Sequence, residues 1–184
     1  MSAFLTRAAL VGLTLLAAPM AQAATLDGQT LSAEYRYPDL GTLYPLATPN
    51  PSGSFVVGAG VEAVINVEGV TNITLDFIGN SLTVLFGTVA DNPTWTDKPF
   101  NGLRIALESP GKFTSFSQTD GPGIKATSFN ANELFINWAG LSYADGMTLT
   151  FDIDYAAPVP LPAGLPLLAL ALGGLAVLGR KRAA

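Results

Sequence analysis

Apolar and polar side chains alternate over several stretches in the middle of the chain. The alternation covers residues 72–77 and resumes over 81–86, with Gly79 and Asn80 between the two runs. A period of two places one face of a strand in a core and the other face in water. A Gly-Asn pair between two such runs is a turn signal. The pattern therefore predicts a β-hairpin over 72–86.

A further alternating run covers 147–155, and stretches rich in β-branched and aromatic residues, bounded by Gly, Pro, Asn and Asp, predict more strands. They lie at about 30–37, 54–57, 61–67, 103–108, 113–118, 126–129 and 134–138. Roughly ten short strands favour an all-β fold, an antiparallel β-sandwich with Greek-key connections or, alternatively, a jelly roll. Its predicted core consists of Leu75, Phe77, Val84, Leu103, Ile105, Ile136, Trp138, Leu149, Phe151 and Ile153.

Two segments interrupt this succession of strands. Prolines punctuate residues 38–52, and residues 90–101 are polar and broken, so neither segment suits a central strand. Long loops on a rigid scaffold are the usual place for a binding function. No repeat of 20–50 residues is present, which argues against a propeller or a solenoid.

The N-terminus has the organisation of a secretory signal peptide. Arg7 provides a positive charge, and residues 8–18 form a short apolar stretch. Ala21 and Ala23 then occupy the two small positions that signal peptidase requires. We expect cleavage after Ala23 and a mature chain that starts at Ala24; an uncleaved membrane anchor is the alternative.

The C-terminus carries a charge-free apolar run over 161–179. As a helix this run would be about 28 Å long, close to the thickness of a bilayer core. The basic residues that follow would act as stop-transfer charges and hold this end on the cytoplasmic side. They are Arg180, Lys181 and Arg182. The run therefore predicts a single transmembrane helix, with the body of the protein exported.

A short proline-containing motif immediately precedes this helix and overlaps its start. It consists of Val159, Pro160, Leu161, Pro162 and Ala163. Motif, apolar helix and basic cluster together resemble the PEP-CTERM class of bacterial sorting signals, in the variant that begins Val-Pro-Leu-Pro-Ala. The resemblance is limited to residues 158–184. A plain C-terminal membrane anchor is the alternative interpretation.

The resemblance implies that the five motif residues are recognised by an exosortase, a membrane-embedded cysteine protease of Gram-negative bacteria that removes such tails. Prolines favour the extended backbone that proteases bind. The chain would then divide into a signal peptide (1–23), an extracellular β-sandwich domain (24–157) and a C-terminal sorting signal (158–184). Its partners would be signal peptidase, the exosortase and exopolysaccharide. The protein would be anchored in the inner membrane before processing, and at the cell surface or outside the cell afterwards.

The predicted mature body is acidic. All 14 acidic residues lie within 24–157 but only five of the nine basic ones, so its formal charge is −9. Such a surface repels nucleic acid and anionic lipid, and no nucleic-acid partner is expected. The chain contains neither cysteine nor histidine. This composition excludes disulfides, Ser-His-Asp and Cys-His catalysis, and histidine metal sites within one chain.

Three candidate sites remain, and each competes with a simple structural role. The first is a calcium site, which needs six to eight oxygen ligands. Asp152 and Asp154 share a strand face, and Asp120 and Asp145 precede glycines in turns, but no dense calcium loop is present.

Carbohydrate binding is the second candidate. Trp95 lies among polar residues in a predicted loop, and three tyrosines flank another loop. A flat aromatic face suits a sugar ring, but a loop tryptophan also packs commonly against a sheet. The three tyrosines that flank the other loop are Tyr35, Tyr37 and Tyr44.

The third candidate is a carboxylate-pair glycosidase, a hydrolytic chemistry that needs neither histidine nor cysteine. The body contains five glutamates that could supply the pair, Glu34, Glu62, Glu68, Glu108 and Glu133. We instead expect a non-enzymatic surface or extracellular-matrix protein linked to exopolysaccharide or biofilm. A carbohydrate-binding module is the first alternative and a small glycosidase the second. No catalytic residue and no cofactor are predicted.

Overall fold

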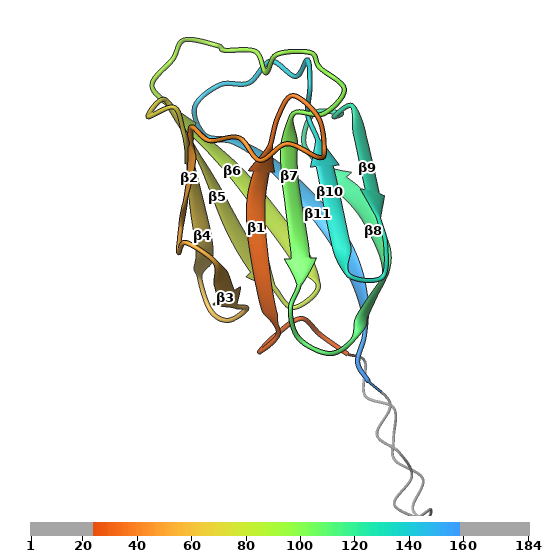
Figure 1. Ribbon diagram of the computed structural model, residues 1–184. Coiled ribbons are helices and arrows are strands. Elements are labelled where there is room, and N and C mark those ends of the chain that lie inside the picture. Colours follow the sequence, from red (N-terminus) through yellow and green to blue (C-terminus); the bar gives the residue numbers. More distant parts are fainter. Residues whose placement is uncertain (1–23, 159–184) are drawn as a thin grey trace, which may run out of the picture.

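The computed structural model describes residues 24–158, and the predicted signal peptide and the predicted sorting signal after Pro158 lie outside the described residues (Figure 1). Within 24–158 the chain forms eleven strands and no helix. The strands make two sheets, and every strand pairing in them is antiparallel. The expected all-β, antiparallel class is therefore confirmed.

The smaller sheet has five strands. In spatial order they are β3 (Ser54–Val56), β1 (Thr30–Arg36), β7 (Gly102–Leu107), β10 (Glu133–Asn137) and β9 (Ala126–Phe129). The larger sheet has six strands. In spatial order they are β2 (Ala47–Asn50), β4 (Val61–Val67), β5 (Thr71–Ile78), β6 (Ser81–Thr88), β11 (Met147–Ala156) and β8 (Lys112–Asp120).

The predicted hairpin is formed by β5 and β6. Ile78 pairs with Ser81 across the turn, and Gly79 has a φ of 61°, a conformation that glycine adopts at no steric cost. This hairpin continues a meander from β4, and β11 then lies beside β6 although the two are far apart in sequence. Since β11 also pairs with β8, the last strand of the domain is an interior strand of the larger sheet.

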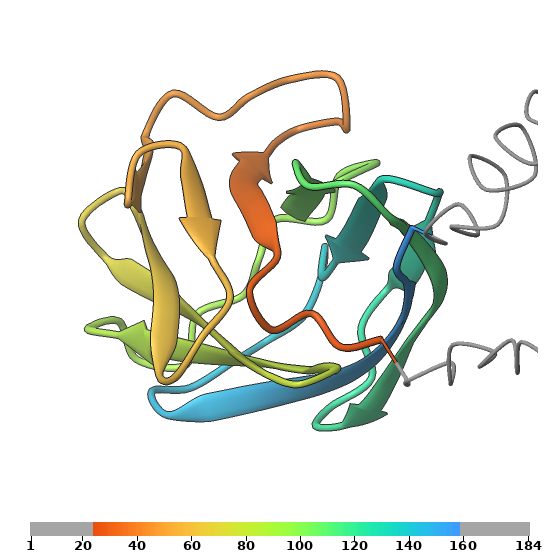
Figure 2. The ribbon, with the colours of Figure 1, turned by 90° about the horizontal axis from the view of Figure 1, so that it is seen from below.

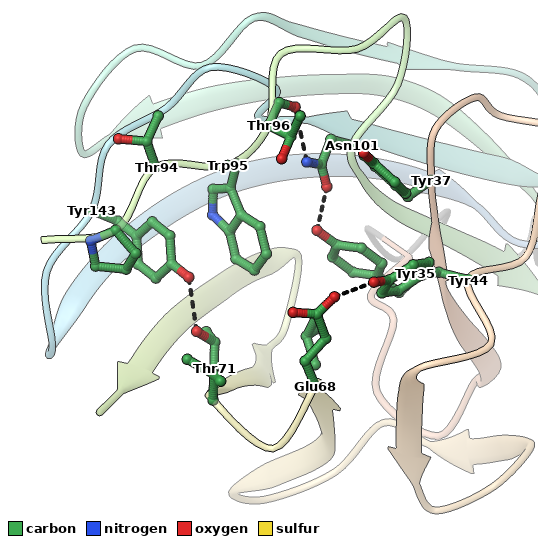
Figure 3. Close-up of a pocket in the computed structure, with 13 residues that line it drawn as sticks. Tyr35, Tyr37, Tyr44, Glu68, Thr71, Thr94, Trp95, Thr96, Asn101 and Tyr143 are labelled. Atoms are coloured by element: carbon green, nitrogen blue, oxygen red, sulfur yellow. Dashed lines mark hydrogen bonds between the residues drawn. The ribbon is translucent and has the colours of Figure 1, made fainter. Parts of the chain in front are cut away.

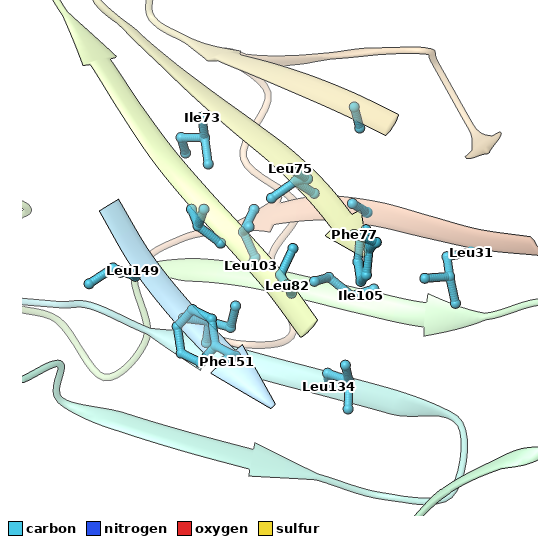
Figure 4. Close-up of a cluster of buried hydrophobic side chains, with 14 of the residues drawn as sticks. Leu31, Ile73, Leu75, Phe77, Leu82, Leu103, Ile105, Leu134, Leu149 and Phe151 are labelled. Carbon is cyan, nitrogen blue, oxygen red and sulfur yellow. The ribbon is translucent and has the colours of Figure 1, made fainter. Parts of the chain in front are cut away.

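The two sheets face each other across one hydrophobic core (Figures 2 and 4). Leu31, Ile105 and Leu134 enter it from the smaller sheet and are fully buried. Phe77 and Phe151 enter it from the larger sheet, also fully buried. All ten side chains that the alternation assigned to the core are at most 1% exposed, so this prediction is confirmed.

One strand lies where the sequence indicated a loop. Ala47–Asn50 forms β2, inside the proline-punctuated segment 38–52. It pairs with β4 on one side only, so it is an edge strand. An edge strand tolerates Pro49, whose missing N–H would cost a hydrogen bond in a central strand.

The two ends of the domain differ in character. β1 begins and β11 ends at the same end, the lower one in Figure 1, so the chain enters and leaves the described domain there. The opposite end carries the longest connections. We call it the loop end; it is formed by residues 37–46, 68–70, 89–101 and 138–146. Over the described range 24–158, no helix is long and apolar enough to cross a membrane.

The alternation predicts a sharp contrast between two isoleucines of β5. Ile73 is fully buried and Ile78 is 72% exposed. We expect Ile73→Ala to lower the free energy of unfolding by about 2–5 kcal/mol, because it leaves a cavity in the core. The matched control Ile78→Ala should change it by less than about 0.5 kcal/mol. Urea unfolding followed by circular dichroism measures both, and equal effects would contradict the assigned face of β5.

Candidate functional site

A pocket of about 230 Å³ opens at the loop end (Figure 3). This volume lies below the roughly 300 Å³ at which pockets for drug-sized ligands begin, so it suits a single ring or a head group. Five aromatic side chains contribute to its lining, Tyr35, Tyr37, Tyr44, Trp95 and Tyr143. The principal polar side chains are Glu68, Thr71, Thr94, Thr96 and Asn101.

Trp95, the sugar contact suggested by the sequence, lines this pocket but is only 8% exposed. Its ring stacks on Tyr143 with a centroid distance of 4.7 Å and an interplanar angle of 9°. Its centroid is also 5.8 Å from that of Trp138, which the sequence placed correctly in the core. Most of the indole is therefore covered by protein, and the sugar contact stays a prediction.

Hydrogen bonds between two loops hold Trp95 in this position. Its backbone N–H donates to the carbonyl of Leu141 at 2.9 Å, and its own carbonyl accepts from the N–H of Gly140 at 2.8 Å. The N–H of Tyr143 donates to the carbonyl of Pro93 at 2.9 Å. Segments 89–101 and 138–146 thus pair like two short strands, and they fix one wall of the pocket.

Two buried asparagines support the base of this wall. The Asn101 side chain accepts a hydrogen bond from the Tyr35 hydroxyl and donates to the carbonyl of Thr96 at 3.0 Å. The Asn137 Oδ1 accepts from the backbone N–H of Asn101 at 3.1 Å. Removing one partner would leave a buried polar group unpaired at a cost of about 1–3 kcal/mol. Burial also raises the pKa of Tyr35, so its hydroxyl stays a neutral donor.

Gly102 allows this arrangement because it has no side chain. A Cβ at this position would collide with the backbone carbonyl oxygen of Ile136 on the neighbouring strand β10. The close approach of β7 and β10 brings Asn101 next to Asn137, so the glycine is part of the support of the pocket.

Glu68 provides the negative charge of the pocket. It lies in the turn between β4 and β5 with a φ of 57°, and Gly69 follows it. Its carboxylate accepts a hydrogen bond from the Tyr44 hydroxyl, which raises the pKa of Tyr44 to about 12. Figure 3 shows this carboxylate pointing toward the rings of Tyr35 and Trp95. Among residues 24–158, no lysine or arginine forms an ion pair with Glu68.

The other four predicted glutamates lie elsewhere. Glu34 and Glu133 both form ion pairs with Arg104, on neighbouring strands of the smaller sheet. Burial alone would raise the pKa of Glu34, but hydrogen bonds from Arg36 and Arg104 lower it. Of the five glutamates, therefore, only Glu68 lines the pocket. The other two glutamates, Glu62 and Glu108, bond to nearby groups. Glu62 accepts a hydrogen bond from the backbone N–H of Phe77 at 2.7 Å, and Glu108 accepts one from the Ser32 hydroxyl at 2.7 Å.

The aspartates considered for calcium are spread over the larger sheet and its connections. Asp152 pairs with Ser117, and Asp120 with Thr150. Asp145 accepts from the backbone N–H of Thr88 at 2.9 Å. The described part of the chain contains no group of three or more His, Cys, Asp or Glu side chains that could hold a metal ion.

The sequence indicated part of this pocket and missed the rest. Tyr35, Tyr37, Tyr44 and Trp95 were singled out as aromatic residues in or near loops. The partners that complete the pocket come from strand starts and from the connection before β11, where no pattern distinguished them. They are Thr71, Asn101 and Tyr143. A polar residue directly before a strand, after a loop that contains Trp95 and Phe100, is the signal that could have identified Asn101.

Three comparisons were made, and no family model, curated protein or solved structure matches the chain. The candidate site is therefore defined by its own geometry.

The contact between Tyr44 and Glu68 makes a pH-dependent contribution to stability. A raised folded-state pKa gives stability that is complete below the ordinary tyrosine pKa of about 10 and is lost as the pH rises through about 12. We expect Tyr44→Phe to reduce the fall in melting temperature over this interval. The control is Tyr37→Phe, which removes a hydroxyl that does not bond to Glu68 and should change the fall less than Tyr44→Phe does. Equal slopes for wild type and Tyr44→Phe would contradict the assigned hydrogen bond.

Proposed function

We propose that this chain is an exported, non-enzymatic surface or extracellular-matrix protein, associated with exopolysaccharide and sorted by an exosortase-type system. Its predicted signal peptide and the resemblance of residues 158–184 to a sorting signal support export and processing. The absence of histidine and cysteine from the sequence supports a role without Ser-His-Asp or Cys-His catalysis.

The observation that carries this proposal is that the two ends of the domain differ. The chain enters and leaves it at one end, and the pocket lies at the opposite end. β11 ends at Ala156, directly before the linker to the predicted sorting motif that starts at Val159. A domain held at the membrane by that tail would present its loop end away from the lipid, toward the surrounding matrix.

We further infer that the domain is a β-sandwich of the Greek-key or jelly-roll kind. Two antiparallel sheets share one core, which is the arrangement that such sandwiches have. Consecutive strands also cross between the sheets, as β1 to β2 and β3 to β4 do. Many secreted and cell-surface binding domains use this architecture, with binding residues in the loops at one end.

A carbohydrate-binding module is the alternative function, and the aromatic lining of the pocket is the observation that favours it. A glycosidase is less well supported. That chemistry needs two carboxylates on either side of the scissile bond, and among the described residues Glu68 is the only glutamate or aspartate that lines the pocket. Hydrolysis of the host polysaccharide by the purified chain would identify the enzyme alternative.

The intact mass of the native protein tests the proposed sorting. We expect the major species in the envelope or culture medium to start at Ala24 and to lack the segment after about Pro158, because signal peptidase and an exosortase-type protease cut the chain at these places. Retention of Arg182 in the major species would favour a plain membrane anchor. An N-terminus at Met1 or Ser2 would contradict export through a cleaved signal peptide.

A further inference from the structure

The pocket combines aromatic walls with a carboxylate that has no cationic partner. Tyr35, Tyr44 and Trp95 lie near the carboxylate of Glu68 in Figure 3. No lysine or arginine is among the residues that line the pocket, and none in 24–158 forms an ion pair with Glu68. The pocket therefore has a negative charge that its own side chains do not neutralise.

Aromatic rings and a carboxylate attract the same kind of ligand. The faces of tyrosine and tryptophan rings carry partial negative charge, which attracts a cation placed over them. A nearby carboxylate adds a direct charge–charge attraction. The predicted body has a formal charge of −9, and this charge favours the approach of cations over anions.

The unneutralised charge of Glu68 favours a ligand with a positive charge over a neutral sugar, and internal hydrogen bonds add to this preference. A neutral sugar needs free donors and acceptors for its hydroxyl groups, but much of the polar lining is already bonded internally. The Tyr35 hydroxyl donates to Asn101, whose amide in turn donates to Thr96. The hydroxyls of Thr71 and Tyr143 lie 2.7 Å apart and bond to each other. Three kinds of group remain for a ligand: the ring surfaces, the carboxylate, and the indole N–H of Trp95, which has no hydrogen-bond partner among the described residues.

We propose that the pocket binds a small organic cation, in which an ammonium group is carried on methyl groups or on a sugar ring. Glu68 provides the counter-charge, and the half-buried rings of Tyr37 and Tyr44 provide aromatic surface for the cation. The volume of about 230 Å³ suits one such group. Because this inference rests on the pocket alone, it goes beyond the proposed sorting and surface role and can fail independently of it.

Isothermal titration of the full chain, purified in a mild nonionic detergent, tests this inference with three probes. Choline represents a quaternary ammonium, glucosamine an amino sugar, and glucose the neutral sugar of matching size. We expect choline, glucosamine or both to bind with a Kd on the order of 1 mM or tighter, and glucose to bind at least about tenfold more weakly. Binding of choline alone assigns a quaternary ammonium head group, and binding of glucosamine alone assigns an amino sugar.

Variants of two glutamates separate a pocket effect from a general charge effect. Glu68→Gln should weaken cation binding about tenfold or more, because it removes the counter-charge and keeps the shape of the side chain. Glu108→Gln is the matched control; it removes the same charge at the opposite end of the domain and should leave the Kd within about twofold. Circular dichroism checks that both variants keep the fold.

Three results would overturn the inference. They are glucose binding as tightly as glucosamine, no saturable binding of either cation, and a Glu68→Gln variant that binds as wild type does. None of these results would bear on the intact mass of the native protein, so they leave the sorting proposal to its own test.

Discussion

Contacts between aromatic rings at the loop end connect the two sheets, and the pocket depends on them. Trp138 follows β10 of the smaller sheet, and Phe86 lies on β6 of the larger sheet; their rings meet edge to face at 5.1 Å. Trp95 and Tyr143 extend this cluster outward, each within 6 Å of Phe86. Aromatic pairs in such geometries add about 0.5–1.5 kcal/mol beyond the burial of their area. Trp95 and Tyr143 thus belong to the core and also line the pocket.

This double role fixes the shape of the pocket. Its walls are held by core packing, by the hydrogen bonds between segments 89–101 and 138–146, and by the buried amides of Asn101 and Asn137. A ligand that enters a preformed site does not have to order these groups, so less of its interaction energy is lost. Glu68 is held differently. It lies exposed on a turn and reaches the pocket through its bond to Tyr44.

The fold could be predicted because the period of two is a local property. Ile136 and Trp138 were placed in the core since they fall in phase along one strand, and both are fully buried. The edge strand β2 was not predicted, because its pairing with β4 cannot be seen in the local sequence and because Pro49 is untypical of a strand. The signal peptide and the sorting signal were inferred from the sequence, and they lie outside residues 24–158.

The pocket could be predicted only in part, because it assembles from segments that the topology brings together. Trp95 could be assigned to a loop but not to a buried position, since its burial depends on pairing with Leu141 across the loop end. Nor could the role of Glu68 be separated from that of the other glutamates. Each is a single acidic residue inside or next to a predicted strand, and only the turn between β4 and β5 brings Glu68 to the rings.

The most direct test of a preformed aromatic cluster is the quenching of tryptophan fluorescence by acrylamide in the wild-type protein without ligand. The chain has two tryptophans, and both are at most 8% exposed. The structure predicts one blue-shifted emission band that acrylamide quenches weakly, with no second component. A component quenched as readily as in the unfolded chain would place Trp95 in solvent and would contradict the shared role of these rings in core and pocket.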